Sequence, residues 1–179
     1  MYNPIKVMLD EHDIISDAER IVKLLDHYWE KSEEGFIKHV ETLIIFFREY
    51  ADKYHHFKEE QVLFPEVENL ADFAVNSLVS ELKEHHEMFR EHTLSIEQLL
   101  SNNLLEKAYS LLCIYMNELL DHIAAENDEL FVIAESLLSE EVQESIYFRF
   151  KDIDVQLGES RKEHLCTILE DIVLKLDLN

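Results

Sequence analysis

The chain has 179 residues, of which 47% are apolar and 31% are charged, as expected for a globular protein with one core. Its net charge of −23, from 39 acidic residues against 16 lysines and arginines, repels phosphate backbones and argues against nucleic acid as a partner. Two glycines and two prolines leave few turn signals, which favours a few long helices over many short strands.

Apolar residues recur at helical spacing along almost the whole chain. Four long helices are predicted, at residues 4–29, 36–64, 73–100 and 104–137. The breaks between them are a polar turn at 31–35, Pro65 with the connection 69–72, and the Ser-Asn-Asn loop at 101–103.

Four long helices with short connections predict an all-α, up-down-up-down four-helix bundle, which we assign to residues 1–138. Ser139 is a suitable N-cap for a C-terminal helical extension at residues 139–179, with one or two amphipathic helices and a break near Gly158. We expect this extension to pack on the same domain or to join two subunits in a homodimer.

The sequence shows neither a membrane-spanning segment nor a targeting signal. Its fully apolar runs are a few residues long, whereas a spanning helix needs about 20. Residues 1–13 lack the cationic and apolar regions of a secretory signal. We therefore expect a cytoplasmic protein with no membrane partner, in which Cys113 and Cys166 are reduced packing residues.

A repeat with an offset of 67 residues relates the end of the second helix to the end of the fourth. Both segments read His-x3-Glu-x3-Leu-Phe-x3-Glu, the first from His55 and the second from His122. Residues four apart lie one above the other on a helix. The pairs His55 with Glu59 and His122 with Glu126 can therefore each direct an imidazole and a carboxylate into the core of a bundle.

Each pair has a histidine on the preceding helix that shares an apolar face, namely His12 and His85. The helix register places all four histidines in one layer of an antiparallel bundle. The predicted metal ligands are thus His12, His55, Glu59, His85, His122 and Glu126. Imidazoles with carboxylates suit iron, manganese or zinc, and two carboxylates able to bridge favour a pair of ions.

Several neighbouring residues remain as alternatives. His56 with Glu60 repeats the spacing of His55 with Glu59, but on a face with more charged residues. His86 faces Lys83 and Arg90 in the predicted register, so we prefer His85. His92 either orients a ligand or is structural, and Tyr115 either offers its hydroxyl to the site or packs in the core.

These segments resemble the hemerythrin-like HHE cation-binding family over roughly residues 5–137. The resemblance is carried by Glu11-His12-Asp13, His55-His56-Phe57-Lys58-Glu59-Glu60, Glu84-His85-His86-Glu87 and His122-Ile123-Ala124-Ala125-Glu126. It implies a four-helix bundle with a bridged di-iron centre held by the six predicted ligands. Oxygen-carrying hemerythrins have a second third-helix histidine where this chain has Phe89, and an aspartate where it has Asn127, so His56, His86 or solvent completes the coordination.

The function favoured by these features is binding, sensing or reduction of O2, NO or peroxide at two bridged iron ions, for which zinc or manganese could substitute. An iron-storage or iron-sensing module without catalysis is an alternative. A second alternative is a metal-free, acidic helical scaffold. A zinc hydrolase is disfavoured because the sequence contains no HExxH motif.

Overall fold

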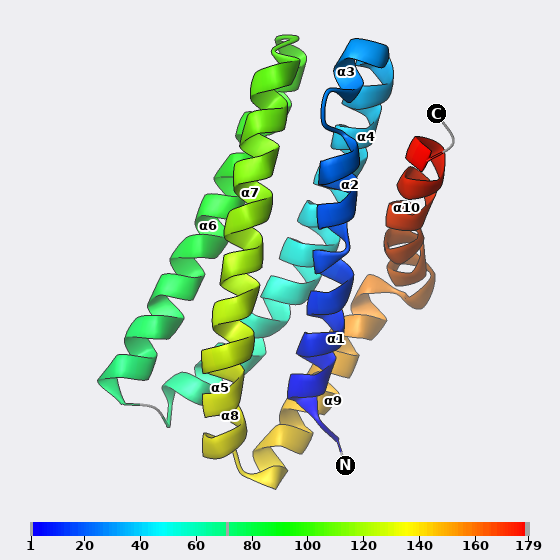
Figure 1. The fold of residues 1–179 in the computed structure, drawn as a ribbon. Helices are drawn as coiled ribbons and strands as arrows, with labels where there is room; N and C mark the ends of the chain where they lie inside the picture. The colour runs from blue at the N-terminus through cyan, green and yellow to red at the C-terminus, as the bar shows by residue number, and fades with distance from the viewer. Residues whose placement is uncertain (1, 71, 178–179) are drawn as a thin grey trace.

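The computed structural model describes residues 2–70 and 72–177, and the described part of the chain is helical with no strand (Figure 1). Ala71 in the predicted connection at 69–72, and the ends of the predicted domains at Met1, Leu178 and Asn179, lie outside the described residues. None of the helices described is both long and apolar enough to cross a membrane.

The first segment of the bundle is divided into three helices, α1 (Pro4–Ser16), α2 (Ala18–Leu24) and α3 (Tyr28–Lys31). Asn3 caps α1 by accepting a hydrogen bond from the backbone N–H of Lys6. The prediction of one unbroken helix over residues 4–29 is wrong, because α1 ends before Asp17 and His27 adopts a left-handed backbone with a φ of 52°.

The second segment changes its helical type along its length. It comprises α4 (Glu33–Phe46), the π-helices η1 (Phe47–His56) and η2 (Glu59–Leu63), and α5 (Phe64–Glu68). Pro65 does not end the helix, since it lies in the first turn of α5, where a missing N–H is tolerated. A π-helix has more residues per turn than an α-helix, so adjacent side chains on it point in more similar directions.

The third segment is the single long helix α6 (Phe73–Ser101), which Asp72 caps by accepting from the N–H groups of Ala74 and Val75. The fourth segment comprises α7 (Leu105–Ala125), the π-helix η3 (Glu126–Leu130) and α8 (Phe131–Leu137). Successive segments run in opposite directions (Figure 1), which confirms the all-α bundle predicted from the sequence.

The C-terminal extension consists of α9 (Glu140–Leu157) and α10 (Glu159–Asp177), which lie along the side of the bundle (Figure 1). The side chain of Ser139 accepts from the N–H of Val142, as expected for the N-cap of α9. Gly158 separates the two helices with a φ of 87°, a conformation that glycine adopts at no steric cost.

The core consists of two apolar clusters, an upper and a lower one as drawn in Figure 1, with a layer of buried polar side chains between them. Each segment crosses all three zones in order. In α1, for example, Met8 belongs to the lower cluster, His12 to the polar layer and Ile15 to the upper cluster. The extension contributes to both clusters, with Phe150 of α9 in the lower and Leu165 of α10 in the upper.

Candidate metal centre

Within the described residues, seven buried side chains of the polar layer fall into two groups, and within each group the ligand atoms lie within 4.8 Å of one another. The two-His group consists of His12, His55, Glu59 and Glu126. The three-His group consists of His56, His86 and His122. Each of these side chains is at most 2% exposed. Together they supply ligands from all four segments of the bundle.

His12 and His55 approach the two-His group from α1 and η1. The Nε2 atom of His12 lies 3.2 Å from Oε2 of Glu126, and Nε2 of His55 lies 3.3 Å from Oε1 of Glu59. The other ring nitrogen of each histidine has a partner outside the group. Nδ1 of His12 donates to Oδ1 of Asn127 at 2.7 Å, and Nδ1 of His55 donates to Oε2 of Glu11 at 3.1 Å. The Nε2 atom of each ring thereby faces the group.

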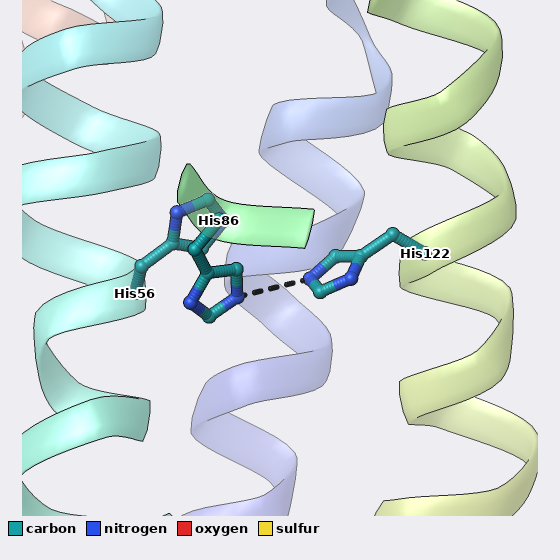
Figure 2. Close-up of side chains that lie close together, drawn as sticks. All are labelled: His56, His86 and His122. Atoms are coloured by element: carbon teal, nitrogen blue, oxygen red, sulfur yellow. Dashed lines mark hydrogen bonds between the residues drawn. The ribbon is translucent and has the colours of Figure 1, made fainter. Parts of the chain in front are cut away.

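Figure 2 shows the three-His group, with His56 on η1, His86 on α6 and His122 on α7. The rings of His56 and His86 are stacked, with centroids 3.8 Å apart. The Nε2 atoms of His86 and His122 lie only 3.1 Å apart. Nδ1 of His86 donates to Oε1 of Glu60 at 2.8 Å.

The two glutamates lie between the groups. Oε1 of Glu59 faces His55, while its Oε2 lies 3.6 Å from Nε2 of His86. Oε2 of Glu126 lies 3.2 Å from Nε2 of His12 and 3.3 Å from Nε2 of His122. Each carboxylate thus contacts one imidazole of each group, which is the arrangement that two bridging carboxylates would need.

Most of the donor atoms facing one another have no hydrogen-bond partner within the described part of the chain. They are Nε2 of His12 and His55, and both carboxylate oxygens of Glu59 and Glu126. Leaving a buried polar atom unpaired costs roughly 1–3 kcal/mol, more if it is charged. A shared cation would satisfy these atoms together, so the residues fit a metal.

Burial shifts the pKa values of several side chains of the layer towards their neutral forms. Burial, and next the neighbouring carboxylate of Glu59, hold the pKa of Glu126 well above its usual range. Burial and the adjacent imidazoles hold the pKa values of His56 and His122 well below theirs, so these rings are neutral and their lone pairs are available. Burial lowers the pKa of His12 to about 4. His55 differs, because the carboxylates of Glu59 and Glu11 outweigh its burial and raise its pKa to about 9, so a cation would have to displace a proton from this ring.

The structure brings five of the six predicted ligands into the two groups, and the sixth, His85, lies outside both. His85 is half-buried, and its Nδ1 lies 3.4 Å from Nδ1 of His122. Its place is taken by His86, which is completely buried instead of facing solvent beside Lys83 and Arg90. The inward stripe of α6 has three- and four-residue spacing and consists of Val79, Leu82, His86, Phe89, Thr93, Ile96 and Leu100. The alternation of spacings is visible in the sequence, but the polar His86 and Thr93 within the stripe obscured it.

His56 was kept only as an alternative in the sequence analysis, for a different reason. An α-helical register turns it away from His55 towards charged neighbours, but it is 2% exposed. Both histidines lie on the π-helix η1, whose wider turn lets two adjacent residues reach the same layer. Glu60, the alternative partner of His56, instead accepts from His86 and from Nη2 of Arg90 at 2.8 Å.

The remaining histidines lie away from the two groups. Nδ1 of His92 lies 3.4 Å from Oε2 of Glu118, and His39 packs against Tyr28. Tyr115 is buried, and its ring contacts Phe47 and Phe89.

A cavity of about 10 Å³ adjoins the three-His group. It is lined by the aromatic side chains Phe47, Phe89 and Tyr115, by His56 and His86, and by the polar side chains Arg48, Asp52, Arg90 and Thr93. A volume of this size holds about one water-sized molecule. The cavity therefore admits only a very small ligand to this side of the layer.

Comparison with known proteins gave one match. The family model described as Hemerythrin HHE cation binding domain matches residues 3–134, a stretch that contains every member of both groups. No curated protein and no solved structure matched the chain.

Proposed function

We propose that this chain, which belongs to the hemerythrin HHE cation-binding domain family, holds two iron ions and binds, senses or reduces a small ligand such as O2, NO or peroxide. The domain is a cation-binding domain, and its buried histidines and glutamates form clusters able to hold metal. The observation that carries the proposal is the set of inward-facing, unpaired donor atoms on these residues.

Two ions are proposed because the imidazoles divide into two sets that the carboxylates join. His12 and His55 would hold one ion, and His56, His86 and His122 the other. Glu59 and Glu126, each close to an imidazole of both sets, would bridge the two.

Iron is preferred because the ion in the three-His group would have three imidazoles and both carboxylates, five ligands, whereas zinc sites are usually four-coordinate. Zinc or manganese could still enter such nitrogen and oxygen sites, so the loaded metal must be identified directly. When bound, a pair of irons supplies the electrons that binding or reducing O2, NO or peroxide requires.

The protein's own residues fix the ligands and restrict access. Asn127, Glu11 and Glu60 each hold the Nδ1 of one histidine, which keeps the ring in place with Nε2 facing the layer. The aromatic side chains around the cavity exclude bulk water and any ligand of more than a few atoms.

Anaerobic purification followed by iron reconstitution, metal analysis and optical spectroscopy tests the proposal. We expect close to two irons per chain, and a change in near-ultraviolet absorption when the reduced protein meets O2 or NO. Glu59→Ala and Glu126→Ala should each lose most of the iron, whereas Glu135→Ala, which alters an exposed glutamate of α8, should lose none. A wild-type protein that stays metal-free after reconstitution would contradict the proposal and support the acidic scaffold, and one zinc per chain would support a hydrolase.

A further inference from the structure

A fully buried lysine lies beside the two-His group. Lys58 is 0% exposed, and its Nζ donates to Oε1 of Glu11 at 2.6 Å and contacts Oδ1 of Asp154 at 2.7 Å. The other oxygen of Glu11 accepts from Nδ1 of His55. An unbroken chain of charged contacts therefore runs from Asp154 through Lys58 and Glu11 to His55.

The far end of this chain lies on the C-terminal extension. Asp154 belongs to α9, which follows the family match at residues 3–134. The hydroxyl of Tyr54 donates to the same oxygen of Asp154 at 2.6 Å, and the ring of Tyr54 lies 3.8 Å from Nζ of Lys58. Lys162 of α10 contacts the Tyr54 hydroxyl and lies 3.6 Å from Oε1 of Glu11. Both helices of the extension thus contribute a charge to the environment of His55.

Asp154 supplies one of the two carboxylates that hold the buried ammonium group of Lys58. The network contains two carboxylates, Glu11 and Asp154, and three ammonium groups, Lys58, Lys162 and the more exposed Lys151, which donates to Oδ2 of Asp154 at 3.0 Å. Without the carboxylate of Asp154, Glu11 would be the one carboxylate of the network left to offset its ammonium groups, and the excess of positive charge near His55 would grow. An excess positive charge in a buried site disfavours a nearby cation and draws Glu11 away from the imidazole that it orients.

The three-His group has no such link. The Nδ1 partner of His86 is Glu60, which Arg90 of α6 holds within the bundle. Nδ1 of His122 faces His85, which is also on α6. In the described part of the chain, the residues that contact the three imidazoles of this group all belong to the bundle. Changes in the extension should therefore act mainly on the two-His group.

We propose that α9 and α10 form a clamp for the two-His half of the centre, in which Asp154 is a positioning residue that acts through Lys58 and Glu11 on His55. Cation affinity at this half and docking of the extension are then coupled, and the coupling is reciprocal. This proposal rests on the proposed function, because it requires a metal in the two-His group. If the protein acts as a sensor, loss of one ion would be transmitted as weaker docking of α9 and α10 on the bundle.

The test compares Asp154→Asn with Asp152→Asn, which makes the same change at an exposed position of the same helix. Both variants and the wild type are reconstituted with ferrous iron under anaerobic conditions, and iron removal by a chelator is followed over time. In Asp154→Asn, one iron per chain should leave about tenfold faster than in the wild type, or be missing, while the other is retained. Asp152→Asn should release each of the two irons at the wild-type rate.

Hydrogen exchange supplies the reciprocal measurement. Loading the wild type with iron should slow amide exchange in α9 and α10, and Asp154→Asn should abolish most of that protection. A merely structural role would instead weaken both irons alike and leave the effect of loading on exchange unchanged. If Asp154→Asn does not fold, Tyr54→Phe, which removes the hydroxyl that donates to Asp154 but changes no charge, should show the same selective loss to a smaller extent.

The outcomes separate the two proposals. A wild type without iron refutes the proposed function. A wild type with two irons, together with an Asp154→Asn variant that releases both at wild-type rates or both faster to the same degree, refutes the clamp and leaves the di-iron centre intact.

Discussion

The adjacent histidines of α6 offer a sharp test of the centre, because only one of them lies in a ligand group. His86 is fully buried with its Nε2 facing His122, whereas His85 is half-buried and outside both groups. His86→Ala should remove a ligand of one ion, while His85→Ala should remove only a neighbour of the His122 ring. The two substitutions delete the same side chain from neighbouring positions of one helix, so each is a control for the other.

The size of the effect follows from linkage between binding and folding. A cation at 100 times its dissociation constant stabilises the folded state by about 2.7 kcal/mol. For a protein of this length, each kcal/mol corresponds to roughly 2–4 °C in melting temperature. Loss of one ion in His86→Ala should therefore lower the melting temperature of the iron-loaded protein by roughly 5–11 °C relative to His85→Ala.

Thermal melts with and without iron, followed by circular dichroism under anaerobic conditions, measure this difference. The iron-dependent part of the melting temperature should fall in His86→Ala, with about one iron left per chain, and should be nearly unchanged in His85→Ala. The reverse result, in which His85→Ala loses an iron and His86→Ala keeps both, would show that the sequence-based choice of ligand was correct and the inward stripe of α6 misassigned.

Three further predictions concern the surroundings of the centre. Lys58→Met should destabilise the metal-free protein by about 3–5 kcal/mol in urea denaturation, because it leaves the carboxylates of Glu11 and Asp154 without their buried partner. Asp154 lies within hydrogen-bond reach of Lys58 and the Tyr54 hydroxyl, contacts that outweigh burial and lower its pKa from 3.8 to about 2. The stability that ionised Asp154 contributes should therefore be complete above about pH 4 and be lost as the pH falls towards 2. In thermal melts between pH 5 and pH 2, Asp154→Asn should lack this part of the wild type's loss of stability. Arg90→Ala should accelerate NO binding in stopped-flow experiments on the loaded protein, because Arg90 lines the cavity and holds Asp52 there, and equal rates in variant and wild type would rule out this entry route.

The bundle itself could be predicted from the sequence because it depends on local signals. Helical periodicity, scarce glycine and proline, and caps such as Ser139 are all properties of neighbouring residues. The break of the first helix near Asp17 was missed because no glycine or proline marks it. The left-handed backbone at His27 was missed for the same reason, since no glycine or proline lies in that turn.

The centre was predicted only in part, for reasons that differ between residues. The repeat identified His55, Glu59, His122 and Glu126 because residues four apart share a face on any helix. His56 depends on the π-helical turn of η1, which the sequence pattern does not show. The contact of Lys58 with Asp154 joins residues far apart in the chain, and local patterns hold no information about such pairs.

The polar layer also accounts for the position of the extension. A layer of buried imidazoles and carboxylates divides the apolar core into two clusters, and in the metal-free protein its unpaired atoms lower the stability of the bundle. The extension spans this layer from outside, since Phe150 packs into the lower cluster and Leu165 into the upper one, with Asp154 at the level of the layer between them. Apolar contacts on both sides of the layer thus hold Asp154 against Lys58. The same two helices therefore support the bundle where its core is interrupted and place a carboxylate against the buried lysine beside the two-His group.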